Sequence, residues 1–318
     1  MKSRAYIPLA MKDDPNLPQT QAGKDRDLFF SCLQGDTARA ERLLKAGANA
    51  NTRQARADYA PPVSALYAAA DADRVDAVRL LLRHHAKVDE GTPEGRTPLM
   101  VAVRRGNMEV AQLLIGAKAR VDLAYGQDTL FDMAERSDDP APMLRLLLEK
   151  LMPQQLKEIF LEAARDAKPA IIGVLATLPG FDVEAHDATG NTALILAAQH
   201  AENPALAAKT VRLLLDKGAA IDAENDLKET ALSAAMMKRP VSADAVKALV
   251  DAGADITRET LAGITALEAA QLAGNEEILP CFESARKQSI LREAKKFFEG
   301  TGNKITIRKP LQPRKPPH

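Results

Sequence analysis

Tryptophan is missing from this sequence, and aromatic residues of all kinds make up only 4% of its 318 residues. Hydrophobic residues nevertheless reach 46%. A core must therefore be built mainly from leucine, alanine, valine and isoleucine. This composition excludes a core centred on large rings and favours thin layers of helices, which leucine and alanine form readily.

An excess of charge of one sign is also missing, because 43 lysines and arginines balance 43 aspartates and glutamates. The whole chain therefore offers no field that would attract nucleic acid or a membrane surface. We expect neither of them as a partner. Any electrostatic recognition must come from a local arrangement of charges.

Long apolar runs are absent as well, and none approaches the roughly 20 residues that a membrane-spanning helix needs. The first ten residues lack the apolar core of a signal peptide, and Lys12, Asp13, Asp14 and Pro15 follow at once. We expect a soluble, cytoplasmic protein. Export into a host cell by another route remains the alternative.

The sequence does contain an internal repeat. Thr97-Pro98-Leu99 and Thr192-Ala193-Leu194 share a threonine, a small residue or proline, and a leucine. Alignment on this leucine gives one apolar anchor every 30 to 38 residues, around the period of about 33 that one class of helical repeat has. The anchors are Leu28, Leu66, Leu99, Leu130, Phe160, Leu194, Leu232 and Leu267.

A second apolar group follows most of these anchors, for example Leu80-Leu81-Leu82 and Leu146-Leu147-Leu148. A turn signal such as Gly106-Asn107 separates the two groups, so each unit predicts two short antiparallel helices. Glycine ends several second helices, where it can adopt a left-handed conformation. His85 and Lys118 replace that glycine in two units, and we expect each to cost about 1 kcal/mol if its φ is positive.

These segments resemble ankyrin repeats, with Thr97-Pro98-Leu99, Gly106-Asn107 and the leucine-rich second helix as the matching motif. The resemblance implies an all-α solenoid of about eight helix-pair repeats with projecting loops and a concave face. The predicted organisation is an N-terminal tail (1–24), the repeat array (25–283), a C-terminal capping helix (284–300) and a basic, proline-rich tail (301–318).

The two cysteines, Cys32 and Cys281, then lie at opposite ends of the array, too far apart for a disulfide. We interpret both as small buried hydrophobic residues.

The repeat pattern weakens in two places. Between the fourth and fifth units, around 138–142 and 152–153, the projecting loop is missing, so helix is expected to follow helix almost directly. We expect the curvature to change there. The first junction is longer instead, over 51–63, and is either a partner contact or a loose insertion.

No pattern of catalytic or metal-binding residues has useful spacing. His84 and His85 are adjacent near a helix end and point in different directions, which argues against joint metal binding. The segment 300–304, Gly-Thr-Gly-Asn-Lys, lacks the strand and helix that flank a phosphate-binding loop. We therefore expect no enzyme, no metal and no cofactor, and keep an enzyme or nucleotide-binding module as a remote alternative.

Ankyrin repeats usually hold partners with their projecting loops and with exposed first-helix positions five and six residues after the anchor, as the resemblance implies. On the first helices these partner-binding candidates are Arg104, Arg105, Glu135, Arg136, Arg165, Gln199, His200 and Lys238. In the loops they are Glu94, Arg96, Tyr125, Gln127, Thr189, Asn191, Asp226 and Glu229.

The middle of the helical row is basic. Its cations are Arg104, Arg105, Arg136, Arg165 and Lys238, against the anions Asp71, Glu135 and Asp166. Such a row can pair with carboxylates, which favours an acidic segment of a partner protein. The other interpretation is an ordinary solvated helix face. Tyr125 is the loop residue expected to contribute most, because aromatic side chains supply much interface energy.

The sequence therefore predicts a scaffold or adaptor that binds another protein. The alternative is a bacterial ankyrin-repeat effector that acts on a host protein, with the basic C-terminal tail as an export signal. The alanine-rich, tryptophan-free composition favours a bacterial source. The partner and the oligomeric state stay open.

Overall fold

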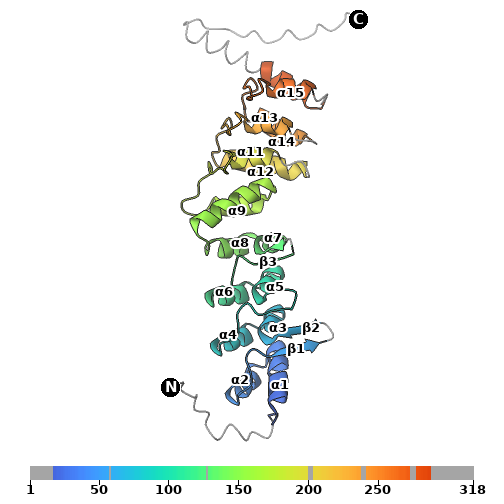
Figure 1. Cartoon of the computed structure of the whole chain (residues 1–318), viewed down its shortest axis with the longest axis vertical. Helices are drawn as coiled ribbons and strands as arrows, with labels where there is room; N and C mark the ends of the chain where they lie inside the picture. Colours follow the sequence, from blue (N-terminus) through green and yellow to red (C-terminus); the bar gives the residue numbers. More distant parts are fainter. Residues whose placement is uncertain are drawn as a thin grey trace, which may run out of the picture. The chain divides into compact units, whose positions relative to one another are not determined.

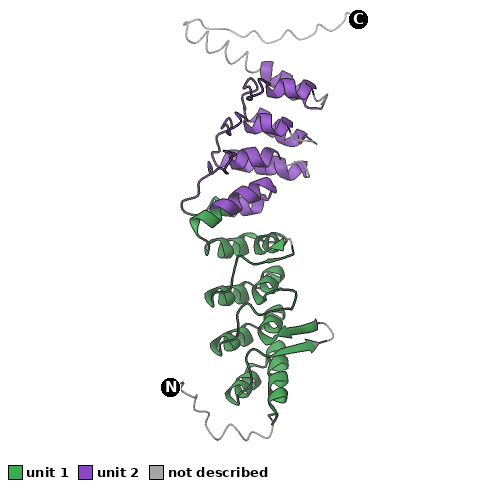
Figure 2. Ribbon diagram, viewed as in Figure 1, with its two compact units in different colours: residues 1–156, 173–179 green, residues 157–172, 180–318 purple. Residues whose placement is uncertain are grey.

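The structure is a computed structural model that describes residues 17–56, 59–126, 128–199, 203–237, 241–272 and 277–287 of the chain. The chain divides into two compact units, drawn in different colours in Figure 2. Unit 1 comprises residues 1–156 and 173–179, and unit 2 comprises residues 157–172 and 180–318. No described helix is both long enough and apolar enough to cross a membrane.

Unit 1 is built from pairs of short helices with two small hairpins between pairs (Figure 1). The helices are α1 (Gln21–Gln34), α2 (Thr37–Lys45), α3 (Ala65–Asp71), α4 (Val75–Arg83), α5 (Pro98–Arg105), α6 (Met108–Gly116), α7 (Leu130–Glu135) and α8 (Ala141–Leu148). Strand β1 (Arg53–Arg56) pairs antiparallel with β2 (Tyr59–Ser64), and β3 (Ala124–Tyr125) pairs antiparallel with β4 (Asp128–Thr129).

The helices of unit 1 form two stacked layers. The first helices of successive pairs contact one another, α1 with α3, α3 with α5 and α5 with α7. The second helices stack in the same way, α2 with α4 and α4 with α6. The predicted anchors Leu66, Leu99 and Leu130 are buried in this stack, so the core consists of the apolar positions that recur with the repeat.

Unit 2 repeats the arrangement. Its helices are α11 (Ala193–Ala198), α12 (Pro204–Asp216), α13 (Ala231–Met237), α14 (Ala243–Asp251) and α15 (Ala266–Leu272), followed by helical residues 279–287. α11 contacts α13, α13 contacts α15, and α12 contacts α14. The division between the units passes through α9 (Pro153–Arg165) and α10 (Pro169–Leu175).

A side-chain cap explains why threonine or serine recurs two residues before the anchor. Thr97 Oγ1 accepts a hydrogen bond from Met100 N at 3.2 Å, and Ser64 and Thr192 cap α3 and α11 in the same way. The first N–H groups of a helix have no partner within it, so each cap stabilises the helix by about 1 kcal/mol.

The cap of α7 corrects one predicted register. Thr129 accepts a hydrogen bond from Asp132 N at 3.2 Å, and the Asp132 carboxylate accepts one from Thr129 N at 2.8 Å. With Thr129 at the cap, Phe131 rather than Leu130 corresponds to Leu99. Both residues are apolar and buried, so the apolar pattern alone could not choose between them.

Positive backbone φ angles occur where the sequence predicts them. His85 has φ 60° and Lys118 has φ 67°, in place of the glycines that end other second helices, such as Gly218 at 92°. The prediction is confirmed. Lys228, with φ 60° in a projecting loop, is a further non-glycine residue in this conformation that the sequence analysis missed.

Both predicted irregularities are visible in the structure. α8 ends at Leu148 and α9 begins at Pro153 with no projecting loop between them, which confirms that prediction. In the long first junction, the described residues 53–56 and 59–64 form the antiparallel hairpin β1–β2. Arg53, at the start of this hairpin, forms an ion pair with Glu90 of the next loop at 3.2 Å.

Several predicted boundaries concern residues outside the described part. These are 1–16 of the N-terminal tail, 288–300 of the capping helix and the whole of 301–318. α1 begins at Gln21, inside the predicted tail. Cys32 is buried as predicted, but Cys281 is only half-buried, because Ile278 and Phe282 are the side chains of its segment that are buried.

Candidate protein-binding surface

The ends of the first helices in unit 1 carry three of the predicted arginines. Arg104 and Arg105 occupy the last turn of α5, and Arg136 is the C-cap of α7. All three are exposed, whereas Glu135 is half-buried. With the register fixed by Thr129, Arg136 is the equivalent of Arg104, and Glu135 is the equivalent of a buried position.

Two of these arginines already have carboxylate partners. Arg105 Nε donates to Asp71 Oδ1 at 2.9 Å across neighbouring helices. Arg136 binds Asp128 with both terminal nitrogens, at 2.8 and 2.7 Å, and this hydrogen bonding raises the pKa of Arg136. The sequence-based count of charges omitted Asp128, which lies in the hairpin next to α7. Fewer arginines of the row are therefore available to a partner protein than the sequence predicts.

Arg104 is different. Its side chain is exposed, and within the described ranges it makes no hydrogen bond or ion pair. Burial and Asp71 raise the pKa of Tyr67 of α3, and the charge of Arg104 offsets a small part of that rise. A guanidinium without an internal counter-ion retains all of its donors for a ligand.

The loop before α5 presents a second arginine in a fixed position. The guanidinium carbon of Arg96 lies 4.3 Å from the centre of the Tyr125 ring, a stacked cation–π geometry. Burial and Asp71 raise the pKa of Tyr67, and Arg96 offsets part of that rise. Tyr125 therefore contacts Arg96 and is still partly exposed at the surface. Glu94, two residues away, is exposed, and its pKa is lowered mainly by a hydrogen bond from Thr92.

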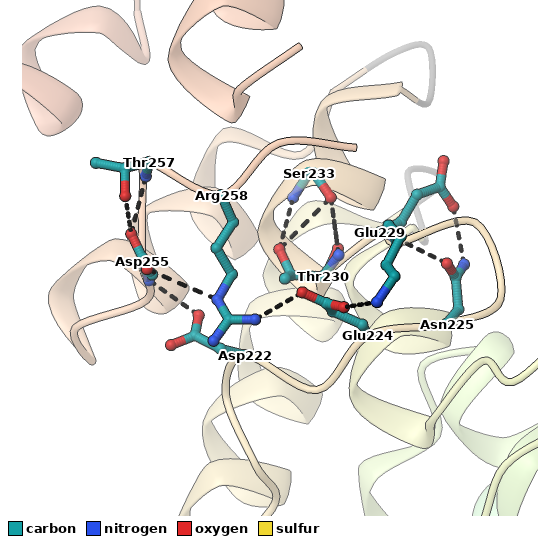
Figure 3. A network of polar contacts seen from close by, with 10 residues as sticks. Asp222, Glu224, Asn225, Glu229, Thr230, Ser233, Asp255, Thr257 and Arg258 are labelled. Carbon is teal, nitrogen blue, oxygen red and sulfur yellow. Dashed lines mark hydrogen bonds and ion pairs between the residues drawn. The ribbon is translucent and has the colours of Figure 1, made fainter. Parts of the chain in front are cut away.

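The predicted loop residues of unit 2 serve mostly to hold the loops together. Asn225 Nδ2 donates to Asn191 Oδ1 at 2.8 Å and to Glu229 Oε2 at 2.9 Å. The backbone N–H of Asp226 donates to Thr189 O at 3.2 Å. Figure 3 displays Asn225 beside Glu229 in this network. Asn191 and Glu229 are therefore structural residues as well as candidates for binding.

A charged cluster beside these loops was missed. Arg258 donates to Glu224 at 2.7 Å, Lys228 donates to the other oxygen of Glu224 at 3.0 Å, and Asp222 accepts from Asp255 N at 2.9 Å (Figure 3). Glu224 and Arg258 are 34 positions apart, and Asp222 and Asp255 are 33 apart. A search for opposite charges at the repeat period would have found the Glu224–Arg258 pair.

Unit 2 also exposes large apolar side chains at the positions where partners were expected. Leu227 and Leu261 lie at two loop tips, 57% and 68% exposed, and the N–H of Leu261 donates to Leu227 O at 3.3 Å. Met237 and Leu272, at the ends of α13 and α15, are 55% and 78% exposed. Both lie five residues after the anchors Leu232 and Leu267, at one of the two exposed first-helix positions that the resemblance implies.

Comparison with known families decides what this repeat is. The family model described as ankyrin repeats in three copies matches residues 28–125 and 160–260. The chain belongs to the ankyrin repeat family. The resemblance inferred from Thr97-Pro98-Leu99 is thereby confirmed, and the number of repeats, about eight, stays a prediction.

Named relatives are ankyrin repeat proteins too. Ankyrin repeat and KH domain-containing protein mask-1 of Caenorhabditis elegans is 30% identical over 200 residues, which are 61% of this chain and 7% of that protein. The chain thus spans a small part of that relative's length. Among solved structures, an ankyrin repeat protein (28% identity, TM-score 0.36) and an ankyrin repeat domain from Acinetobacter baumannii (26% identity, TM-score 0.37) each match 69% of this chain and 96% of theirs.

Ankyrin repeats are generally protein–protein interaction modules, and the family is typically a non-enzymatic scaffold. The described part of this ankyrin repeat chain contains no group of three or more histidine, cysteine, aspartate or glutamate side chains that could hold a metal ion.

The remaining predicted site residues lie in unit 2 or outside the described residues. Gln199, half-buried, is the C-cap of α11, and Arg165 lies 3.9 Å from Asp187 within unit 2. Gln127, His200 and Lys238 lie outside the described residues.

Proposed function

We propose that this chain is a scaffold or adaptor that holds a partner protein through the first-helix ends and loops of unit 1. The observation that carries the proposal is the contrast among three neighbouring arginines. Arg105 and Arg136 are neutralised by Asp71 and Asp128, whereas Arg104 is exposed and has no such pair among the described residues. The partner protein would supply the anion that pairs with Arg104.

The chemistry of this surface favours an anionic side chain flanked by groups that can contact an aromatic ring. Arg104 can bind a carboxylate with two parallel hydrogen bonds. Tyr125, half-buried and stacked on Arg96, offers a ring edge in the β3–β4 hairpin before α7, and tyrosine is among the side chains that contribute most to interfaces. The acidic segment expected from the sequence remains the proposed partner chemistry, contacting mainly Arg104.

The test is the reversal of one charge. Arg104→Glu removes the exposed cation without breaking an internal ion pair, whereas reversal of Arg105 or Arg136 would place a carboxylate against Asp71 or Asp128 and test the fold instead. Arg83→Glu is the matched control, because Arg83 is also exposed and in the last turn of its helix, on the second-helix layer. Both variants place a negative charge in the last turn of a helix, where the helix dipole disfavours it.

Proteins captured from a lysate of the source cell by the wild-type chain are identified by mass spectrometry, and the affinity of each purified candidate is then measured. We expect Arg104→Glu to lower the affinity for the true partner at least about tenfold, because one charge-assisted contact is lost. Arg83→Glu should bind like wild type. Equal affinity of wild type and Arg104→Glu, with both chains folded by circular dichroism, would rule the proposal out.

A further inference from the structure

The loops before α13 and α15 expose apolar side chains next to each other. Leu227 is 57% and Leu261 is 68% exposed, and the N–H of Leu261 donates to Leu227 O at 3.3 Å. This backbone hydrogen bond holds the two loops side by side, and we call residues 222–229 and 255–263 together the loop pair. Adjacent exposed leucines, unlike scattered ones, favour a binding surface.

The loop pair carries an excess of negative charge. Carboxylates occupy positions 222, 224, 226, 229, 255 and 259, and the cations are Lys228 and Arg258. Both cations bind Glu224, Lys228 at 3.0 Å and Arg258 at 2.7 Å (Figure 3). The exposed Asp226 and Glu259 make no side-chain hydrogen bond or ion pair with any described residue. These two carboxylates flank the leucines in sequence and can attract a cation.

The same imbalance extends over the repeats of unit 2. Residues 180–283 contain 17 aspartates and glutamates but 8 lysines and arginines, whereas residues 25–148 of unit 1 contain 18 and 17. Residues 301–318, which also belong to unit 2, contain five lysines and arginines and no aspartate or glutamate. Within unit 2, the repeats and the C-terminal segment therefore carry opposite net charges.

One part of this C-terminal segment combines positive charge with apolar residues. Residues 304–309 read Lys-Ile-Thr-Ile-Arg-Lys. In an extended chain every second side chain lies on the same side, about 7 Å from the next, which would put Ile305, Ile307 and Lys309 in one row. The two isoleucines of such a row can cover the two leucines of the loop pair. Lys309 and Arg308 can then pair with the flanking carboxylates.

The chain is long enough for this segment to return to the loop pair. Eighteen residues separate Lys287, the last described residue, from Ile305. Even at the helical rise of about 1.5 Å per residue they would span about 27 Å, roughly three packed helices. The loop 255–263 directly precedes α15 and the helical residues 279–287 of the same unit. The contact therefore requires no second copy of the chain.

We propose that residues 304–309 bind the loop pair of unit 2, with the two isoleucines on Leu227 and Leu261 and the cations beside Asp226 and Glu259. The loop pair is an interaction surface for a basic segment with alternating apolar residues, and the chain's own C-terminal segment occupies it. This surface is separate from the Arg104 surface proposed in unit 1, so the two can be tested independently.

Photo-cross-linking from the C-terminal segment tests the contact in the full chain. A photoreactive residue replaces Asn303, which an extended chain places on the same side as Ile305. Dilute protein is irradiated, and the cross-linked peptides are identified by mass spectrometry. We expect cross-links within one chain, to residues 222–229 or 255–263, with a yield that does not depend on protein concentration. High salt should reduce the yield, because it screens exposed charges.

Charge reversal tests the ionic part of the contact. Asp226→Lys combined with Glu259→Lys should lower the cross-linking yield about fivefold, because two attractions become repulsions. Asp216→Lys combined with Asp251→Lys is the matched control, since these two exposed carboxylates lie at the ends of α12 and α14. The control should cross-link like wild type.

Removal of the leucines tests the apolar part. Leu227→Ser combined with Leu261→Ser should lower the yield about tenfold, because the isoleucines lose the apolar surface that they cover. Both side chains are mostly exposed, so the variant should fold, which circular dichroism checks.

Three results would overturn the proposal. Cross-links confined to other parts of the chain, or no cross-links, would show that the segment does not bind the loop pair. A wild-type yield in both the charge-reversed and the serine double variants would exclude these side chains as its contacts. Cross-links that join two chains and increase with protein concentration would assign the surface to a second copy. None of these results bears on the proposed function, which the affinity of Arg104→Glu decides.

Discussion

Corresponding projecting loops of the two units carry different contacts. In unit 1, Arg96 in the loop before α5 stacks on Tyr125 of the following hairpin, and both side chains stay half-buried. In unit 2, the buried Asn225 donates to Asn191 Oδ1 of the preceding loop. The polar contact is therefore partly exposed at this place in unit 1 and buried in unit 2.

The largest expected effect comes from the amide that joins the loops of unit 2. Asn225 is buried, donates to Asn191 and Glu229, and accepts from the N–H groups of Leu227 and Glu229 at 2.9 Å. Asn225→Ala leaves these groups without partners and should cost about 2 to 4 kcal/mol in the free energy of unfolding. Chemical denaturation measures this change.

The corresponding loop position in unit 1 is the control. Thr92 Oγ1 accepts a hydrogen bond from Arg96 N at 3.2 Å, and its other partner, Glu94, is exposed, so Thr92→Ala should cost only about 1 kcal/mol. If both substitutions cost the same, the proposed difference between the loops of the two units would be wrong.

Removal of a helix cap should have the same intermediate effect in both units. Thr97→Ala in unit 1 and Thr192→Ala in unit 2 each remove the side-chain acceptor at the start of a first helix. Each should lower the free energy of unfolding by about 1 kcal/mol. Denaturation curves of the two variants should coincide, and a difference above about 1 kcal/mol would contradict equal roles for the caps.

Acid should weaken the loop around Asp187 in unit 2. Burial raises the pKa of Asp187, but hydrogen bonds from Thr189 and Asn191 outweigh it, so the pKa is lowered from 3.8. A carboxylate with a lowered folded-state pKa stabilises the fold above its unfolded pKa and loses that contribution as the pH falls through the folded pKa.

The difference in stability between wild type and Asp187→Asn should therefore be constant at neutral pH and shrink below about pH 3.8. Urea denaturation at a series of pH values measures it. Asp251→Asn, which removes an exposed carboxylate of α14, is the control. A difference that stays constant down to pH 2 would exclude a role for the Asp187 charge.

The smallest effect on stability is expected at the two apolar loop tips. Leu227 and Leu261 are mostly exposed, so replacing both with serine should change the free energy of unfolding by less than about 0.5 kcal/mol per site. Affinity for the partner should also stay unchanged, because the proposed surface lies in unit 1. A loss of affinity in this double variant would move the binding surface to unit 2.

Much of the fold could be predicted because the repeat is local. The anchor leucines, the caps and the positive φ angles of His85 and Lys118 follow from residues within one unit. The register of α7 could not, because Leu130 and Phe131 are both apolar and only the Thr129–Asp132 hydrogen bonds distinguish them.

The binding residues were harder to predict, because pairing across repeats decides which charges remain free. Arg105 and Arg104 are adjacent in sequence, yet only Arg105 reaches Asp71, on a neighbouring helix. Tyr125 was singled out for its ring, but its stacking on Arg96 depends on the β3–β4 hairpin, which positions it. Such contacts depend on three-dimensional neighbours rather than on position within the motif.

Site-specific photo-cross-linking tests the central claim most directly. A photoreactive residue is placed at position 104 in unit 1, at position 83 on the second-helix layer, or at position 237 in unit 2, each in the full chain. We predict that one partner protein is cross-linked from position 104 and not from position 83 or 237. Cross-linking of that partner from 83 or 237, with none from 104, would contradict the account.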